Sequence, residues 1–293
     1  MAKMKVDSTE KKKLSRSAEV WRRYRKSPTA MIGLAIILVI ILGAIFADII
    51  VPYDYGIKQV IPDRLQGPSL KHLFGTDDLG RDLFSRVIHG SRSSLVLGIL
   101  TTAVATLIGG FLGGICAYYG NRVDNIIMRL LDVITSIPST LLSLSIVAAL
   151  GPGIRNLVIA ITVSRVPTFA RVIRSAVLNI VNQEYIEAAK AGGTRNLRIM
   201  LRHVYPNAMS PIIVQCTMSI SQLILQAAGL SFLGMGMQPP APEWGALLNS
   251  ARDFMRTAPH LMLFPGIAIV LAALAFNLVG DGLRDAFDPR LKS

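Results

Sequence analysis

The sequence has few of the charged residues that keep most soluble domains in water. Only 17% of its 293 residues are charged and 6% are aromatic. An average soluble domain has about 25% charged residues, so this chain is too sparsely charged for that class. Hydrophobic residues reach 52%, and the mean hydropathy is +0.49. We therefore predict a membrane protein.

Residues that form disulfides or hold metals are also scarce. Cys116 and Cys216 each lie inside an apolar segment without a Cys-x-x-Cys pair, so we interpret them as packing residues. The four histidines are scattered along the chain: His72, His89, His203 and His260. We expect no resident metal, although a transported metal stays open.

Motifs for nucleotide binding and hydrolysis are missing from the chain. No Gly-Lys pair occurs, which excludes the Gly-x-x-x-x-Gly-Lys-[Ser/Thr] loop that cradles nucleotide phosphates. No Gly-x-Ser-x-Gly elbow occurs either, so a serine hydrolase is disfavoured. We therefore expect no catalytic residue and no cofactor in this chain.

Basic residues give the chain a net charge of +13. They cluster beside apolar segments, as cytoplasmic residues of membrane proteins do, so we expect a lipid bilayer rather than nucleic acid as partner. With the amino terminus in the cytoplasm and six spans, and with basic residues near the cytoplasmic ends of spans counted as cytoplasmic, 21 of the 31 basic residues fall on the cytoplasmic side, nine outside and one inside a span. Both termini are therefore predicted to be cytoplasmic.

Six apolar segments are long enough to cross a bilayer, which requires about 20 residues of helix. They cover residues 31–51, 94–119, 126–150, 156–174, 208–236 and 261–283. Residues 1–30 are predicted to be a cytoplasmic tail with an interfacial helix anchored by Trp21 and Tyr24, and Ser27 and Pro28 would start the first span. A cleaved signal peptide is the competing interpretation, but no small-residue cleavage site follows.

The remaining divisions follow from these spans. Residues 52–90 form an external loop with an amphipathic helix, residues 91–283 a core with the other five spans, and residues 284–293 a cytoplasmic tail. In the second span, Gly109 and Gly113, like Gly110 and Gly114, have the small-xxx-small spacing that lets helices pack closely.

Polar residues recur inside two spans at intervals of four, three and four. They are Asp132, Ser136, Ser139 and Ser143 in the third span, and Gln215, Ser219, Gln222 and Gln226 in the fifth. On continuous helices each set would form one stripe. The stripes either line a translocation path or bond helices together, and the sequence favours neither.

Arg165 lies inside the predicted fourth span. A charge within the membrane is costly and by default indicates function. Because we place Arg165 near the cytoplasmic end, we favour a side chain that extends to the membrane surface.

Residues 182–206 form a polar segment between the fourth and fifth spans. The pattern predicts a helix over 183–191, a stop at Gly192 and Gly193, and a second helix capped by Thr194 and ended by Pro206. Leu197, Leu201 and Val204 would share its apolar side, opposite three arginines. An ordinary solvated basic loop is the plain alternative.

The same segment resembles the EAA signature of membrane subunits of ABC importers. The matching residues are Glu187, Ala188, Ala189, Gly192, Gly193 and the ending His203-Val204-Tyr205-Pro206. The resemblance implies coupling helices that dock on a separate ATPase, with Glu187, Ala188, Ala189, Gly192, Gly193 and Pro206 as coupling residues. Tyr205 stands where the family usually has leucine, and His203 where it has an apolar residue.

Two further stretches, residues 74–86 and 281–290, resemble the dipeptide, oligopeptide and nickel branch of ABC permeases. This implies an all-α, type I permease fold with six transmembrane helices in a prokaryotic plasma (inner) membrane. It also implies half of a pathway for di- or oligopeptides, with nickel or glutathione as alternatives. The implied partners are a second permease subunit, two ABC ATPase subunits and an extracytoplasmic solute-binding protein.

Two other functional classes stay open. An ion-coupled carrier requires buried carboxylates, for which only Asp132 and Asp48 qualify. A purely structural membrane anchor would not require the long polar segment 182–206.

Overall fold

A computed structural model describes residues 16–288, and every regular element in that range is helical. The α-helices are α1 (Arg16–Tyr24), α2 (Pro28–Ile45), α3 (Ala47–Ile50), α4 (Tyr53–Ile57), α5 (Leu83–Tyr119), α6 (Asn121–Thr135), α7 (Ser139–Leu150), α8 (Ile154–Val181), α9 (Glu184–Ala191), α10 (Asn196–Ile199), α11 (Tyr205–Phe232), α12 (Trp244–Ala251) and α13 (His260–Phe287). Short turns η1 (Ile61–Asp63), η2 (Met200–Val204) and η3 (Arg252–Phe254) join them.

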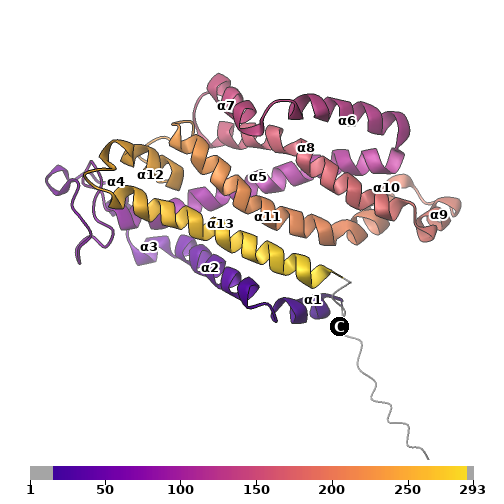
Figure 1. Cartoon of the computed structure of the whole chain (residues 1–293), viewed down its shortest axis with the longest axis horizontal. Coiled ribbons are helices and arrows are strands. Elements are labelled where there is room, and N and C mark those ends of the chain that lie inside the picture. The colour runs from indigo at the N-terminus through magenta and orange to yellow at the C-terminus, as the bar shows by residue number, and fades with distance from the viewer. Residues whose placement is uncertain (1–15, 289–293) are drawn as a thin grey trace, which may run out of the picture.

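The long helices run side by side in one elongated bundle (Figure 1). The helices α9 and α10 lie at one end of it, which we call the coupling end, and α1 lies toward that end beside the last turns of α13. The segment 52–82 and α12 lie at the opposite end, which we call the loop end. α6 and α7 follow one long edge, and α2 follows the other.

The first span begins as its sequence predicts. The Ser27 hydroxyl accepts a hydrogen bond from the Ala30 amide, and Pro28 occupies the first helical turn. The span is α2, continued after a break at Phe46 by α3. The predicted interfacial helix is α1, while residues 1–15 of the predicted tail lie outside the described residues.

The amphipathic helix predicted in the external loop is not a separate element. It forms the first turns of α5, a single helix of 37 residues that begins at Leu83, where the Asp82 carboxylate caps the Ser85 amide. At about 1.5 Å per residue this helix exceeds the hydrocarbon core of about 30 Å. Arg92 lies within this helix, and its charge is balanced because its guanidinium reaches Asp48 at 2.8 Å.

The third span, predicted as one continuous helix over residues 126–150, is broken. α6 and α7 meet at an angle of 80° across Ser136, Ile137 and Pro138. Proline lacks the amide hydrogen that would continue the helical hydrogen bonds, and its ring clashes with the preceding turn, so the chain bends there. The described residues contain five continuous helices that could span a membrane, or six spans if the bent pair counts as one.

Close backbone contacts hold α5 against α8 and the start of α11. A Cβ atom added at Gly113 would lie 2.2 Å from the Ala170 carbonyl oxygen, and one at Gly109 would lie 2.7 Å from the Phe169 Cβ. The packing role predicted for these glycines is therefore confirmed.

Two further corrections concern the lengths of helices: α8 extends to Val181, and α13 extends into the predicted tail as far as Phe287.

Candidate functional site

The turn that separates the two helices of segment 182–206 depends on glycine. α9 ends at Gly192, and Gly193 has φ +74°, a left-handed conformation that side chains disfavour. The Gly193 and Thr194 amides donate to the carbonyls of Lys190 and Ala189 at 3.0 and 3.1 Å. This is the helix stop that the sequence predicts.

One side chain fixes α9 to the bundle and leaves the signature residues outside. Ile186 is completely buried, in a cluster with Val177, Val181, Ile199 and Val204. The EAA residues Glu187 and Ala188 are exposed, as are Gly192, Gly193 and Pro206, while Ala189 is half-buried. An exposed face on a helix with a buried anchor suits docking to another protein.

The second coupling helix differs from its prediction at both ends. Arg195, not Thr194, occupies the N-cap position of α10, and no side chain caps the helix. Pro206 does not end the helix, because it lies in the first turn of α11, directly after the π-helical turn η2. The wider turn accommodates a residue without an amide hydrogen. Residues 196–232 therefore form one continuous path from coupling segment to span.

The apolar side predicted for this helix is only partly buried. Val204 is fully buried, but Leu197 and Leu201 are 68% and 60% exposed. The bundle instead receives Ile199 and Met200, which are adjacent in sequence. The prediction failed because η2 changes the helical period between Leu197 and Val204.

Tyr205, which departs from the family pattern, is a contact between α11 and α5. Its hydroxyl donates to the Gly110 carbonyl at 3.0 Å, and a Cβ atom at Gly114 would overlap the same hydroxyl at 2.0 Å. The glycine thus provides the space that the tyrosine ring requires. On the same helix α5, the Tyr118 hydroxyl donates to Asn196 Oδ1 at 2.8 Å. The coupling segment is thereby tied to the end of α5.

The predicted polar stripe of the third span is broken, whereas that of the fifth span lies on the continuous helix α11. Because α6 and α7 bend apart, Asp132 and Ser143 do not share a helix face. Asp132 accepts a hydrogen bond from Arg171 at 2.8 Å, and Ser136 bonds the carbonyl of Val133 in its own helix. The other members vary in position: Ser139 and Gln215 are half-buried, Ser219 is buried and bonded to Gln215, and Gln222 is exposed.

One member of each stripe does meet the other inside the bundle. The Gln226 amide donates to the Ser143 hydroxyl at 3.2 Å, and that hydroxyl lies 2.9 Å from Ser164 Oγ. Arg165 donates to Gln226 Oε1 through Nε at 2.8 Å and Nη2 at 2.6 Å. The interpretation that Arg165 extends to the membrane surface is wrong, because its guanidinium is bonded to Gln226 inside the bundle.

Buried charges hold the loop end together. Asp77 accepts hydrogen bonds from the amides of Leu79 and Arg81, and from Arg81 Nε at 2.7 Å. Arg86 approaches the same carboxylate at 3.6 Å and donates to the Gly56 carbonyl. Only 6% of Asp77, 4% of Arg81 and 3% of Arg86 is exposed.

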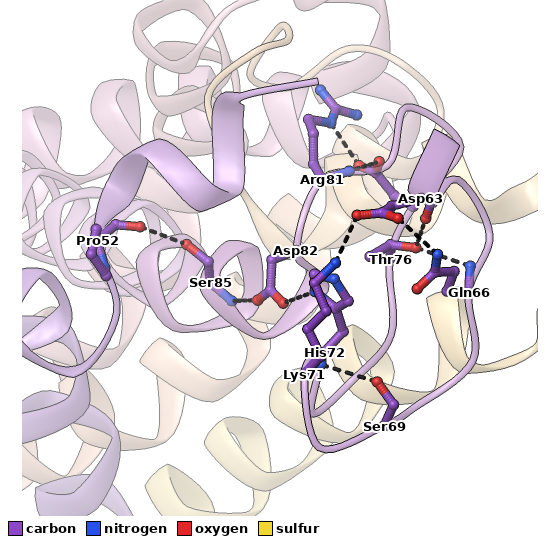
Figure 2. A network of polar contacts seen from close by, with 11 residues as sticks. Pro52, Asp63, Gln66, Ser69, Lys71, His72, Thr76, Arg81, Asp82 and Ser85 are labelled. Carbon is purple, nitrogen blue, oxygen red and sulfur yellow. Dashed lines mark hydrogen bonds and ion pairs between the residues drawn. The ribbon is translucent and has the colours of Figure 1, made fainter. Parts of the chain in front are cut away.

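A second group of contacts closes the loop 63–82 over this cluster. Figure 2 shows Lys71 and Gln66 directed at the Asp63 carboxylate, each at 3.0 Å, and His72 at 2.8 Å from Asp82. The hydrogen bond from Lys71 lowers the pKa of Asp63 below its ordinary value. The sequence predicted this stretch as part of the external loop and gave no sign of the ion pair. Asp77 and Arg81 lie in a turn before α5, where no helical spacing indicates a contact.

Glu243 is a buried carboxylate that sequence reasoning also missed. It is 1% exposed and caps α12, accepting from the amides of Gly245 and Ala246 at 2.8 and 2.9 Å and from the Ser94 hydroxyl at 3.3 Å. Burial raises the pKa of this carboxyl despite these donors. Among residues 16–288, no group of three or more His, Cys, Asp or Glu side chains could hold a metal ion.

This fold defines a class of protein. The inward-facing MetNI methionine ABC transporter contains a chain that matches 69% of this one and 97% of its own length, with a TM-score of 0.57 and 18% identity. At that identity the likeness concerns the fold alone, which is the ABC importer permease fold.

Comparison of sequences defines the family. Residues 105–293 match the model of the binding-protein-dependent transport system inner membrane component, and residues 15–68 match the N-terminal TM domain of oligopeptide transport permease C. The chain belongs to this family of transport permeases. The family assignment made from the sequence is confirmed.

Three relatives show how close the similarity is. The chain is 47% identical to the dipeptide transport system permease protein DppC of Alkalihalophilus pseudofirmus, over 94% of this chain and 90% of the relative. It is 46% identical to the glutathione transport system permease protein GsiD of Escherichia coli, with the same coverage. A di/tripeptide permease, DppC of Pseudomonas aeruginosa, is 44% identical over 94% of this chain and 92% of the relative.

Proposed function

We propose that this chain is a permease subunit of an ATP-driven importer and forms half of a translocation pathway for di- or oligopeptides. The observation that carries the proposal is the exposed helix, glycine turn and second helix at the coupling end. Its second helix continues into a span without a break. The names of the relatives, which transport dipeptides, tripeptides and glutathione, support a peptide as substrate.

The family implies ATPase and binding-protein partners. Our proposal specifies a second, similar permease subunit, two ABC ATPases that bind ATP and magnesium, and one extracytoplasmic solute-binding protein. The chain itself would have no cofactor and no catalytic activity. Both termini and the coupling end would face the cytoplasm of a prokaryotic cell, and the loop end would lie outside the plasma (inner) membrane.

Coupling would act through the helix path just described. Closure of the ATPases on ATP would move α9, and α10 would carry the movement into α11. A rigid path is required because a flexible joint at Pro206 would absorb the displacement. The proposed coupling residues are those on or beside the turn: Glu187, Ala188, Ala189, Gly192, Gly193 and Pro206.

The pathway that we propose differs from the two stripes that the sequence predicts. The wall that we favour is exposed Gln222, since a peptide loses water from its own donors and acceptors as it crosses. Gln226 lies one turn away, and its buried contacts with Ser143 and Arg165 would hold the helices behind this wall together. The roles of Asp132, Ser136, Ser139, Gln215 and Ser219 in the pathway stay predictions.

Uptake by purified components tests this function. The complete complex would be reconstituted in vesicles with its binding protein, and ATP-dependent uptake of a labelled dipeptide, glutathione and Ni²⁺ would be compared. We expect dipeptide uptake that requires ATP, the ATPases and the binding protein. Uptake driven by a proton or sodium gradient without ATP would contradict the proposal and favour an ion-coupled carrier.

A further inference from the structure

A large apolar groove opens on the side of the bundle at the coupling end. Its volume is about 650 Å³, within the range of about 300–1,000 Å³ that is usual for ligand pockets. Four helices line it: α1, α2, α11 and α13. Ser210 provides the one aliphatic hydroxyl, and the remaining lining residues are hydrocarbon, aromatic, proline or thioether side chains.

The wall formed by α1 is held in place. Tyr24 is 3% exposed and packs with Ala30 and Ala286, and its hydroxyl donates to the Ala30 carbonyl at 3.1 Å. A Cβ atom at Gly282 would lie 2.3 Å from the Ala30 Cβ, so α13 and the start of α2 are in close contact. Trp21 stacks on Tyr24 with ring centroids 5.7 Å apart and is 49% exposed at the groove.

Cationic side chains lie next in sequence to Trp21 and Tyr24, which line this groove. Arg22 on α1, and Arg25 and Lys26 just after it, are exposed, and none forms an ion pair within residues 16–288. Arg23 is the exception, because it pairs with Glu19 and donates to the Asp288 carbonyl. An amphipathic basic helix with a tryptophan at its apolar side is typical of binding at the surface of an anionic membrane.

We propose that this groove binds one anionic phospholipid, with an acyl chain between α1, α11 and α13 and its phosphate beside Arg22, Arg25 and Lys26. Charge complementarity selects this occupant, because an apolar helix of another subunit would leave the cations unpaired. The site adjoins the first turns of α11, where Pro206 and Met209 line it directly after the coupling segment. Bound lipid would therefore contact the helix that joins the coupling segment to the membrane.

Quenching of Trp21 fluorescence by brominated lipid tests the site in the intact complex. Nanodiscs would contain a fixed fraction of dibrominated phosphatidylglycerol in one sample and dibrominated phosphatidylcholine in the other. The same measurement on Trp21→Phe gives the signal of every other tryptophan, including buried Trp244, which is then subtracted. We expect stronger quenching by phosphatidylglycerol. Each cation that is removed from Arg22, Arg25 or Lys26 should weaken the selective binding of phosphatidylglycerol by about five-fold.

Two matched variants complete the test. Arg22→Gln/Arg25→Gln should abolish the preference for phosphatidylglycerol, whereas Arg122→Gln/Arg129→Gln, which removes two exposed cations from α6, should preserve it. Equal quenching by both lipids would overturn the proposal. Absence of quenching by either lipid would also overturn it and would indicate that another subunit covers the groove. Because no transport is measured, failure here leaves the proposed function intact.

Discussion

The two ends of the bundle use polar residues in opposite ways. At the loop end, Asp77, Arg81, Arg86 and Glu243 are buried and bonded to one another or to backbone. At the coupling end, Glu187 and the arginines of the second helix are exposed, and apolar Ile186 is the buried anchor. Buried polar networks specify a single local geometry, whereas an exposed face remains free to bind a partner. The loop end is therefore built for rigidity, whereas the coupling end leaves a face exposed for the docking that we propose.

The largest effect should come from breaking the loop end. Asp77→Ala would leave Arg81 and Arg86 buried without their carboxylate, a change that typically costs about 3–5 kcal/mol. We expect a large fall in the thermal stability of the purified complex, with little folded protein recovered. Asp63→Ala, which removes a partly exposed carboxylate from the same loop, is the control. Equal stability of both variants would contradict the rigid role of the Asp77 cluster.

A smaller cost to stability but a large loss of function should follow at the coupling end. Gly193→Val places a β-branched residue at φ +74°, with strain of about 1–3 kcal/mol that the turn can relieve by opening. We expect transport-coupled ATP hydrolysis to fall by roughly ten-fold or more while membrane insertion persists. Gly43→Val makes the same substitution on α2, where the glycine has no positive φ and an added Cβ would meet no atom within 4 Å, so this control should be tolerated. Normal coupling in Gly193→Val would refute the docking role.

Glu243 should make the loop end sensitive to pH. Burial raises its pKa, so the folded state binds this proton more tightly than the unfolded state. The free energy of unfolding should therefore decrease as pH rises from the ordinary value of about 4.3 through the raised native pKa. Glu243→Gln does not titrate, so the stability difference between the two proteins should vary with pH across that window. Parallel stability curves would show that Glu243 has an ordinary pKa.

The smallest effect concerns the contact between the coupling segment and α5. Tyr205→Phe removes the hydrogen bond to the Gly110 carbonyl and should cost about 0.5–1.5 kcal/mol in thermal or chemical unfolding. Tyr205→Leu, which restores the family pattern, would also empty the space beside Gly114. We expect Gly114→Ala to destabilise the parent strongly but to be tolerated in the Tyr205→Leu background. Equal effects of Gly114→Ala in both backgrounds would show that Tyr205 and Gly114 are not coupled.

Local sequence determined the start of the first span, the glycine turn and most span positions. Ser27, Pro28 and Gly193 act within their own few residues, through a cap, a fixed φ and a left-handed turn. Long apolar runs likewise indicate spans wherever they occur. The EAA residues could be read directly because their pattern lies within one short segment, and the structure places them on α9, just before the glycine turn.

Tertiary structure alone decided the features that depend on neighbouring helices. Pro138 could have produced a mild kink or a full break, and the 80° bend separates Asp132 from Ser143. The role of Arg165 required Gln226, 61 residues away, and the fit of Tyr205 required Gly110 and Gly114 on another helix. The physical reason is that periodicity reports which face of a helix is polar, whereas hydrogen bonds and steric fit depend on the helix packed against that face.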